Sequence, residues 1–130
     1  MLTEISNLIT PEVYEVIYRM GHMDEWVIAD ANYPASALSR KVVFSHAPVN
    51  HLLLAETLRQ CHAAGPRLFA RSRDMEGLRG VLEQMSYSRT IVLNRIGRTA
   101  FYRRTRHGYA TVQTSDPRPN ADIIIRKEVV

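Results

Sequence analysis

The sequence is poor in the features that mark secreted and membrane proteins. Its single cysteine, Cys61, can form no internal disulfide and no thiolate metal cage. No apolar run approaches the ~18 residues that a membrane-spanning helix needs. The N-terminus lacks both the basic stretch and the hydrophobic run of a secretory signal. We therefore expect a chain that works in the cytoplasm and makes no contact with a membrane.

The sequence also lacks the common signatures of nucleotide, metal and serine-nucleophile sites. Its six glycines are scattered, so there is no glycine-rich phosphate loop. It contains no HExxH pair and no G-x-S-x-G elbow. The spacing of His46, His51 and His62 gives only weak grounds for a metal site. The sequence therefore predicts neither a metal nor a cofactor.

Charge is present but unevenly distributed along the 130 residues. From Ser86 to the end, nine basic residues stand against three acidic ones, whereas the first 85 residues hold eight basic and ten acidic residues. Such asymmetry is typical of a chain that binds an anion such as nucleic acid, of complementary faces in an oligomer, or of a solvated basic helix. The solvated helix is the simplest of the three interpretations.

The first predicted helix is clearly marked. Thr10 is a good N-cap, Pro11 suits the first helical position, and apolar residues then recur with helical spacing as far as Met20. Gly21 is expected to end this helix in the left-handed conformation. The next apolar run, residues 26–29, does not alternate with polar residues, which indicates a strand covered on both faces.

Strands and helices alternate along the rest of the chain. Further strands are predicted at residues 42–44, 68–70, 90–93, 109–112 and 122–125, and helices at about 48–64, 75–85 and 99–107. There is no repeat or linker, and the length is that of one domain, so we predict a single domain over residues 1–130. The alternation predicts an α/β fold, a layered α/β/α domain with a mixed or mostly parallel sheet.

One segment carries polar residues where such folds bind ligands. In open α/β sheets, ligands collect at the carboxyl ends of strands, and Asp30 directly follows the strand predicted at 26–29. His22 lies in the loop before that strand, and we expect it within reach of such a site. On spacing alone, a solvated histidine and a turn-forming aspartate remain the simpler interpretation.

Motifs at both ends of the chain resemble a known family. Residues 20–25 read MGHMDE and residues 28–35 read IADANYPA, similar to the N-terminal signature of the D-ribose pyranase and L-fucose mutarotase family. Residues 8–12, LITPE, resemble the start of that family's sequences. Residues 98–105, RTAFYRRT, and 122–127, DIIIRK, resemble its C-terminal motifs. The middle of the chain is similar only in the order of its helices and strands.

The resemblance implies an isomerase that interconverts the ring forms of a monosaccharide without a metal, a nucleotide or a redox centre. Mutarotation needs a base for the anomeric hydroxyl and an acid for the ring oxygen, and histidine exchanges protons near neutral pH. By the resemblance, His22 is the catalytic histidine, Asp30 accepts hydrogen bonds from the sugar, and Arg98 donates to it. Arginine at this position favours the fucose branch, because the ribose branch tends to have a histidine there.

The segment before the last strand departs from the family's usual Tyr-(Gly or Ala)-Asn, because this chain has Asn120, Ala121 and Asp122. An ionised Asp122 would only accept hydrogen bonds, so we expect a neutral aldose as substrate, with L-fucose as one candidate. An ion pair between Asp122 and Arg98 would instead consume the carboxylate charge. Tyr102, one turn after Arg98, is expected either to stack on the sugar or to pack in the core or an interface.

The resemblance also implies a homo-oligomer, because the family forms rings, typically decamers, with sites between neighbouring subunits. The opposite charges of the two parts of the chain suit such an interface. Two alternatives stay open. One is a sugar-binding or regulatory protein that has lost the chemistry through the change at residues 120–122. The other is a nucleic-acid-binding module, which rests on charge alone and would use Arg95, Arg98, Arg103, Arg104 and Arg106.

Overall fold

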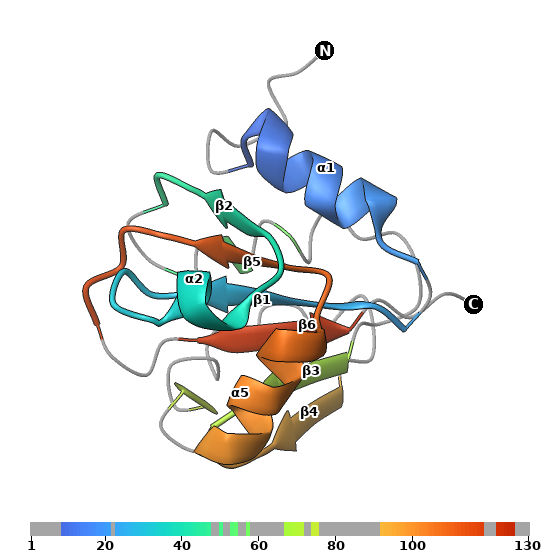
Figure 1. Cartoon of the computed structure of the whole chain (residues 1–130), viewed down its shortest axis with the longest axis vertical. Helices are drawn as coiled ribbons and strands as arrows, with labels where there is room; N and C mark the ends of the chain where they lie inside the picture. The colour runs from blue at the N-terminus through green and yellow to red at the C-terminus, as the bar shows by residue number, and fades with distance from the viewer. Residues whose placement is uncertain are drawn as a thin grey trace.

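The computed structural model describes residues 9–21, 23–47, 50, 53–54, 57, 67–71, 74–75, 92–118 and 122–126. The helices of this part of the chain are α1 (Pro11–Arg19), α2 (Ala35–Leu38) and α5 (Arg98–His107). The strands are β1 (Glu25–Ala29), β2 (Val42–Phe44), β3 (Arg67–Ala70), β4 (Val92–Arg95), β5 (Ala110–Gln113) and β6 (Ile123–Arg126). Figure 1 shows how these elements are arranged.

The strands form one six-stranded sheet in the order β2-β5-β1-β6-β3-β4. β1 pairs in parallel with β5, β5 with β2, and β3 with β4, whereas β6 runs antiparallel to both β1 and β3. The prediction of a mixed, mostly parallel sheet is therefore confirmed. Because the five parallel strands share one direction, their carboxyl ends lie at one edge of the sheet, and β6 begins at that same edge.

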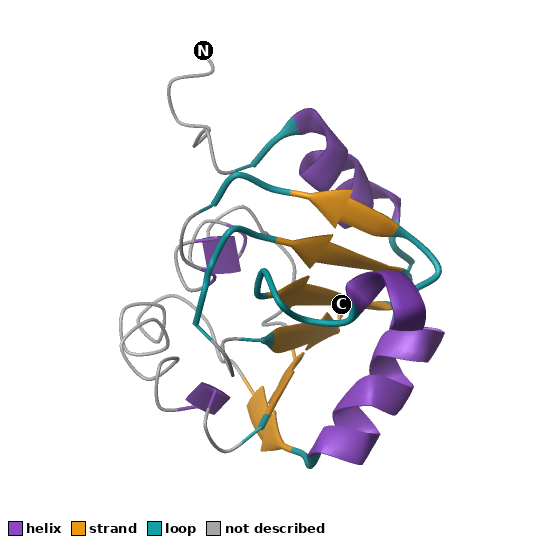
Figure 2. Cartoon of the chain, turned by 60° about the vertical axis from the view of Figure 1, so that its left-hand side comes forward, coloured by secondary structure: helices purple, strands orange, loops and turns teal. Residues whose placement is uncertain are grey.

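Helices cover the sheet on both faces, as the unbroken apolar run of β1 predicted. Trp26 and Ile28 enter one core, and Val27 and Ala29 enter the other. The first core is closed by α1 with Leu53 and Leu54, and the second by α5 and α2. Figure 2 shows α5 lying along one side of the stacked strands. The layered α/β/α arrangement is confirmed, and Trp26, with 1% of its surface exposed, is a packing residue.

The N-terminal end of α1 forms as predicted, but the turn after the helix differs from expectation. The Thr10 hydroxyl accepts a hydrogen bond from the Val13 N–H at 3.3 Å. Gly21 does not adopt a left-handed conformation; the residue with a positive φ, 71°, is Met23. Instead a tight turn follows the helix, in which the Asp24 carboxylate accepts the Gly21 N–H at 2.8 Å and the Asp24 N–H donates to the Gly21 carbonyl.

The strand predictions are correct to within two residues for every strand of the described part of the chain. α2 was not predicted. It has only four residues, too few for a helical pattern, and it follows directly on the predicted loop around Pro34. The helices predicted at 48–64 and 75–85 fall mostly outside the described residues. None of the described helices is both long and apolar enough to cross a membrane.

Candidate functional site

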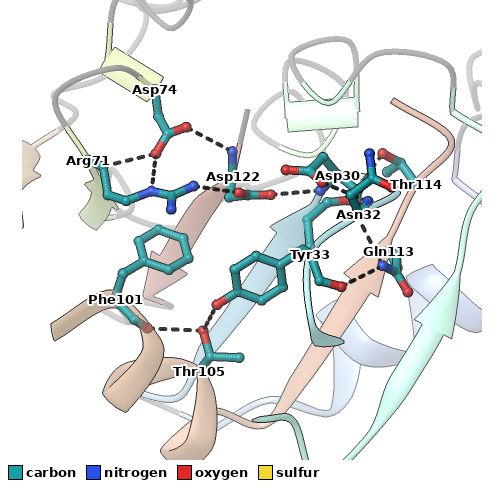
Figure 3. A network of polar contacts seen from close by, with 11 residues as sticks. Asp30, Asn32, Tyr33, Arg71, Asp74, Phe101, Thr105, Gln113, Thr114 and Asp122 are labelled. Carbon is teal, nitrogen blue, oxygen red and sulfur yellow. Dashed lines mark hydrogen bonds and ion pairs between the residues drawn. The ribbon is translucent and has the colours of Figure 1, made fainter. Parts of the chain in front are cut away.

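Polar side chains gather at the carboxyl edge of the parallel strands (Figure 3). Asp30 follows β1, Arg71 follows β3 and Thr114 follows β5, whereas Asp122 stands just before the antiparallel β6. This is the edge where open α/β sheets bind their ligands. The strand order therefore brings two of the predicted site residues, Asp30 and Asp122, to one place.

Asp30 and Asp122 are in direct contact although they are 92 positions apart in the sequence. The Asp30 N–H donates to Asp122 Oδ1 at 2.7 Å. Asp30 Oδ1 accepts a hydrogen bond from the Asn32 N–H at 2.8 Å, which closes a turn of the kind that aspartate favours. Asp30 and Asp122 are 4% and 1% exposed. Asp30 is therefore both a turn former and a member of the cluster.

Asp122 is paired with Arg71, and not with Arg98 as considered from the sequence. Arg71 Nη2 donates to Asp122 Oδ2 at 2.6 Å, and Arg71 Nε donates to Asp74 Oδ2 at 3.0 Å. Asp74 Oδ1 accepts a hydrogen bond from the Asp122 N–H at 3.1 Å. The guanidinium of Arg71 also lies 5.1 Å from the centre of the Phe101 ring, within cation–π range.

Burial governs the electrostatics of this pair. It raises the pKa of the Asp122 carboxyl to about 8, and the charge of Asp30 adds to the rise, whereas the Asp30 N–H and Arg71 oppose it. Both Asp122 oxygens nevertheless act as acceptors, Oδ1 from the Asp30 N–H and Oδ2 from Arg71 Nη2. Burial works to lower the pKa of Arg71, but the Asp74 and Asp122 carboxyls outweigh it and raise the pKa, so the guanidinium stays charged.

An aromatic cluster lies beneath this network. The Tyr33 hydroxyl lies 2.6 Å from Thr105 Oγ1, which itself donates to the Phe101 carbonyl. The rings of Phe101 and Tyr102 meet Tyr33 edge to face, with centroids 5.9 and 5.6 Å away. Burial raises the pKa of Tyr33, so its hydroxyl stays neutral. Tyr102 therefore packs against the cluster, in agreement with the core interpretation of its role.

A second buried carboxylate, Asp116, fixes the chain that leads toward residue 120. It accepts hydrogen bonds from the Asn50 N–H at 2.9 Å and from Arg118, whose Nη2 lies 2.7 Å away. Burial alone would raise the pKa of Asp116, but the bonds from Arg118 and Asn50 outweigh it and lower the pKa to about 2. Asp116 is therefore ionised at neutral pH and anchors this segment.

Arg98 lies at the same edge as Asp30. β4 ends at this edge, and α5 begins with Arg98 shortly after it. The side chain of Arg98 is exposed and makes no hydrogen bond or ion pair with any other residue that the structure describes. A fixed fork of guanidinium donors is thus available at the carboxyl edge.

His22, Asn120 and Ala121 lie outside the described residues. Gly21 and Met23, which flank His22, precede β1, whereas Asp30 follows it, so the strand separates them by roughly 3.3 Å per residue. A hollow of about 440 Å³ lies at that other end of β1, and its walls are Met23, Asp24, Glu25, Ala100, Arg103, Arg104 and His107. Within one chain, the residues flanking His22 and the Asp30 cluster therefore lie at opposite ends of a strand.

Several members of the cluster were not predicted from the sequence. Arg71 was overlooked although it follows a predicted strand in the same way as Asp30, so the rule applied to Asp30 would have found it. The contacts of Tyr33, Asp74 and Thr105 carry no local signal, because they depend on the strand order. Among the residues described, no three His, Cys, Asp or Glu side chains are placed to hold a metal ion.

Comparisons with known proteins agree with the fold. A family described as the RbsD / FucU transport protein family matches residues 3–130. An L-fucose mutarotase of Histophilus somni is 33% identical over 99% of this chain and 97% of its own length. A fucose mutarotase of Streptococcus pneumoniae, solved with L-fucose, is 27% identical with a TM-score of 0.76, over 100% of this chain and 99% of its own. RbsD of Bacillus subtilis, solved with D-ribose, shares the fold at 19% identity, with a TM-score of 0.70 over 94% of this chain and 95% of its own.

Proposed function

The chain belongs to the RbsD / FucU transport protein family, and we propose that it is a monosaccharide mutarotase, an isomerase of carbohydrate metabolism. The resemblance noted in the sequence is thereby confirmed. L-Fucose is the first candidate substrate, because the L-fucose mutarotase of Histophilus somni is 33% identical to almost the whole chain. The protein acts on a neutral aldose and uses no metal and no cofactor.

One observation carries this proposal. Asp30 and Asp122, which belong to the N-terminal and C-terminal motifs of the family, meet at the carboxyl edge of the sheet at 2.7 Å. Arg98, from the motif at residues 98–105, stands at the same edge, and the residue is exposed. Residues scattered over the sequence thus converge on one place where a sugar can be held by hydrogen bonds.

The mechanism follows from proton transfer at two oxygens of the sugar. One group takes the proton of the anomeric hydroxyl, and another gives a proton to the ring oxygen as the bond from that oxygen to the anomeric carbon breaks. The open carbonyl form rotates and closes on the other face, with no net gain or loss of protons. In our proposal His22 exchanges these protons, because an imidazole titrates near neutral pH.

The remaining site residues hold the sugar in register. Asp30 accepts from the sugar hydroxyls and Arg98 donates to them. In our proposal Asn120, Ala121 and Asp122 also belong to the sugar-binding residues, and Tyr102 supports the site from the aromatic cluster. Asp122 Oδ1 accepts the Asp30 N–H, so Asp122 also holds the two ends of the site together.

The proposal includes a homo-oligomer, a ring and most simply a decamer, in the cytoplasm. Gly21 and Met23 lie at the opposite end of β1 from Asp30, which supports a site completed by a neighbouring copy. The uneven charge of the chain suits such contacts. Of the five arginines on which the nucleic-acid alternative rests, Arg104 is already engaged, because it is paired with Glu25 and lies 3.8 Å from the centre of the Phe69 ring.

Saturation-transfer NMR on a panel of neutral aldoses tests the proposal, because it measures exchange between anomers and not binding alone. We expect the protein to accelerate exchange of one or a few sugars, with L-fucose among them. Sugars that bind without faster exchange would instead identify a sugar-binding protein that has lost the chemistry through the change at residues 120–122. A panel with neither binding nor exchange would contradict both functions.

A further inference from the structure

The carboxyl group of Asp122 is fully engaged inside the chain. Oδ1 accepts the Asp30 N–H at 2.7 Å, and Oδ2 accepts Arg71 Nη2 at 2.6 Å. The Asp122 N–H donates to Asp74 Oδ1. Only 1% of the Asp122 side chain is exposed. The side chain that replaces the family's amide therefore has little surface left for a substrate.

Arg71, in contrast, still has hydrogen-bond donors to offer. A guanidinium carries five N–H donors in a planar fork. Nε bonds to Asp74 and one N–H of Nη2 bonds to Asp122, and the other three N–H groups have no acceptor among the residues that the structure describes. The side chain keeps 14% of its surface exposed at the carboxyl edge. Figure 3 shows the guanidinium held between Asp74 and Asp122, above the ring of Phe101.

We propose that Arg71 is a sugar-binding residue of this site and that Asp122 is the positioning residue that aims it. This inference rests on the proposed function and adds a contact to it. An asparagine at position 122 would offer two N–H donors to a sugar, and this chain supplies donors from a guanidinium instead. Arg71 and Asp122 then act as one unit, and a change in either affects substrate affinity through the same contact.

Because Arg71 and Asp122 act together, substitutions of either residue should affect sugar binding through the Arg71 donors. Arg71→Met keeps most of the side-chain volume and removes the donors. The Asp30 N–H is a fixed backbone donor, so Asp122→Asn would keep its carbonyl oxygen there and turn its N–H₂ toward the Arg71 guanidinium, a donor against a donor. Asp122→Asn therefore displaces Arg71, and this displacement can do no harm once Arg71 is absent.

The test measures anomer exchange against sugar concentration for the wild type, Arg71→Met, Asp122→Asn and the double variant. We expect Arg71→Met to raise KM roughly tenfold with kcat nearly unchanged, as for a lost ground-state hydrogen bond to a charged donor. Asp122→Asn should raise KM in the wild-type background but add nothing to Arg71→Met. Arg19→Met, which removes an exposed arginine paired with Glu15 on α1, serves as the control and should leave KM unchanged.

A set of deoxy sugars, each lacking one ring hydroxyl, separates contact from mere structural support. For the analogue that lacks the hydroxyl bound by Arg71, the wild type and Arg71→Met should have equal KM. An equal loss for every sugar, or an unchanged KM, would overturn the inference. If Arg71→Met does not fold, Arg71→Lys keeps the charge, loses the fork and should show the same selectivity in weaker form. A wild type that accelerates no sugar would contradict the proposed function and not this assignment alone.

Discussion

At the scale of single residues, the pKa values of two buried aspartates at the same edge of the sheet shift in opposite directions. Asp116 accepts four N–H hydrogen bonds, three of them from Arg118, and its pKa falls to about 2. Asp122 is buried beside another carboxyl, and its pKa rises to about 8 in spite of Arg71. The difference arises because donors compensate Asp116 for the loss of water, whereas at Asp122 burial and the neighbouring negative charge outweigh the donors.

The lowered pKa of Asp116 makes stability depend on acidic pH. Its folded-state pKa of about 2 lies below the ordinary value of 3.8. The ionised carboxylate therefore stabilises the fold above about pH 4, and this contribution is lost as the pH falls toward 2. Asp116→Asn should lose about 1–2 kcal/mol of unfolding free energy at neutral pH, a value reduced because Arg118 is half exposed and screened by solvent.

Urea denaturation of Asp116→Asn and the wild type from pH 2 to pH 7 measures this effect. The difference between the two proteins should be largest at neutral pH and shrink below pH 4. Glu15→Gln, an exposed carboxylate on α1, is the control and should give a small difference at every pH. A constant gap between Asp116→Asn and the wild type across the range would show that Asp116 acts by shape and not by its charge.

The site could be predicted from the sequence only in part. Asp30 and Asp122 stand at the ends of apolar runs, so the rule for strand ends together with the family motifs identified them. Arg71 was missed as the partner of Asp122, and Arg98 was considered in its place. Which arginine reaches Asp122 depends on β6 lying beside β3, and no local pattern contains that information.

At the scale of elements, the junction between α5 and β1 is a close approach of backbones. Gly108 follows α5, and a Cβ atom at this position would lie 3.1 Å from the Glu25 carbonyl oxygen and 3.2 Å from that of Arg104. The Glu25 carbonyl cannot move freely, since it accepts the Tyr109 N–H at 2.7 Å. The glycine is required here by the space available, and not by an unusual backbone conformation.

Gly108→Ala should therefore lower the free energy of unfolding by about 1–3 kcal/mol, the usual cost of forcing extra atoms into a packed site. Gly97→Ala is the matched control at the other end of α5, because a Cβ there meets nothing within 4 Å. Gly97 is the N-cap of α5, where alanine is less favourable than glycine, so we expect this variant to lose only about 0.5–1 kcal/mol. Thermal and urea unfolding of the two variants measure the difference, and equal stabilities would show that the junction relaxes without cost.

The elements themselves were largely predictable, because each strand is an apolar run bounded by polar or turn-forming residues. The short β2 and the buried β6 were recognised in this way. α2 was not, since a helix of four residues has no periodicity to detect. The order of the strands was also beyond prediction, because the antiparallel insertion of β6 between β1 and β3 is decided by packing on both faces.

At the scale of the whole molecule, the arrangement of the site argues for assembly. Gly21 and Met23, on either side of His22, lie at one end of β1 and the Asp30 cluster lies at the other. If one sugar is to meet both His22 and Asp30, two copies must each supply one of them. A ring of identical subunits satisfies this requirement at every interface.

Mixing experiments test the shared site directly. His22→Ala and Asp30→Ala should each be nearly inactive alone, and subunits of the two variants reassembled together should regain part of the exchange activity, because some interfaces then carry both intact residues. Light scattering should find an oligomer at micromolar concentration. A stable monomer with full activity, or no recovery on mixing at full assembly, would show that each chain holds a complete site.

In our proposal this protein interconverts sugar anomers by proton transfer at His22. The most direct measurement is the exchange rate between the anomers of L-fucose by saturation-transfer NMR, with buffer alone, with the wild type and with a folded His22→Ala variant. We expect rapid exchange with the wild type and a rate lower by roughly 10²–10⁴-fold for His22→Ala, the range for loss of a general acid–base group. Equal rates for the two proteins would contradict it.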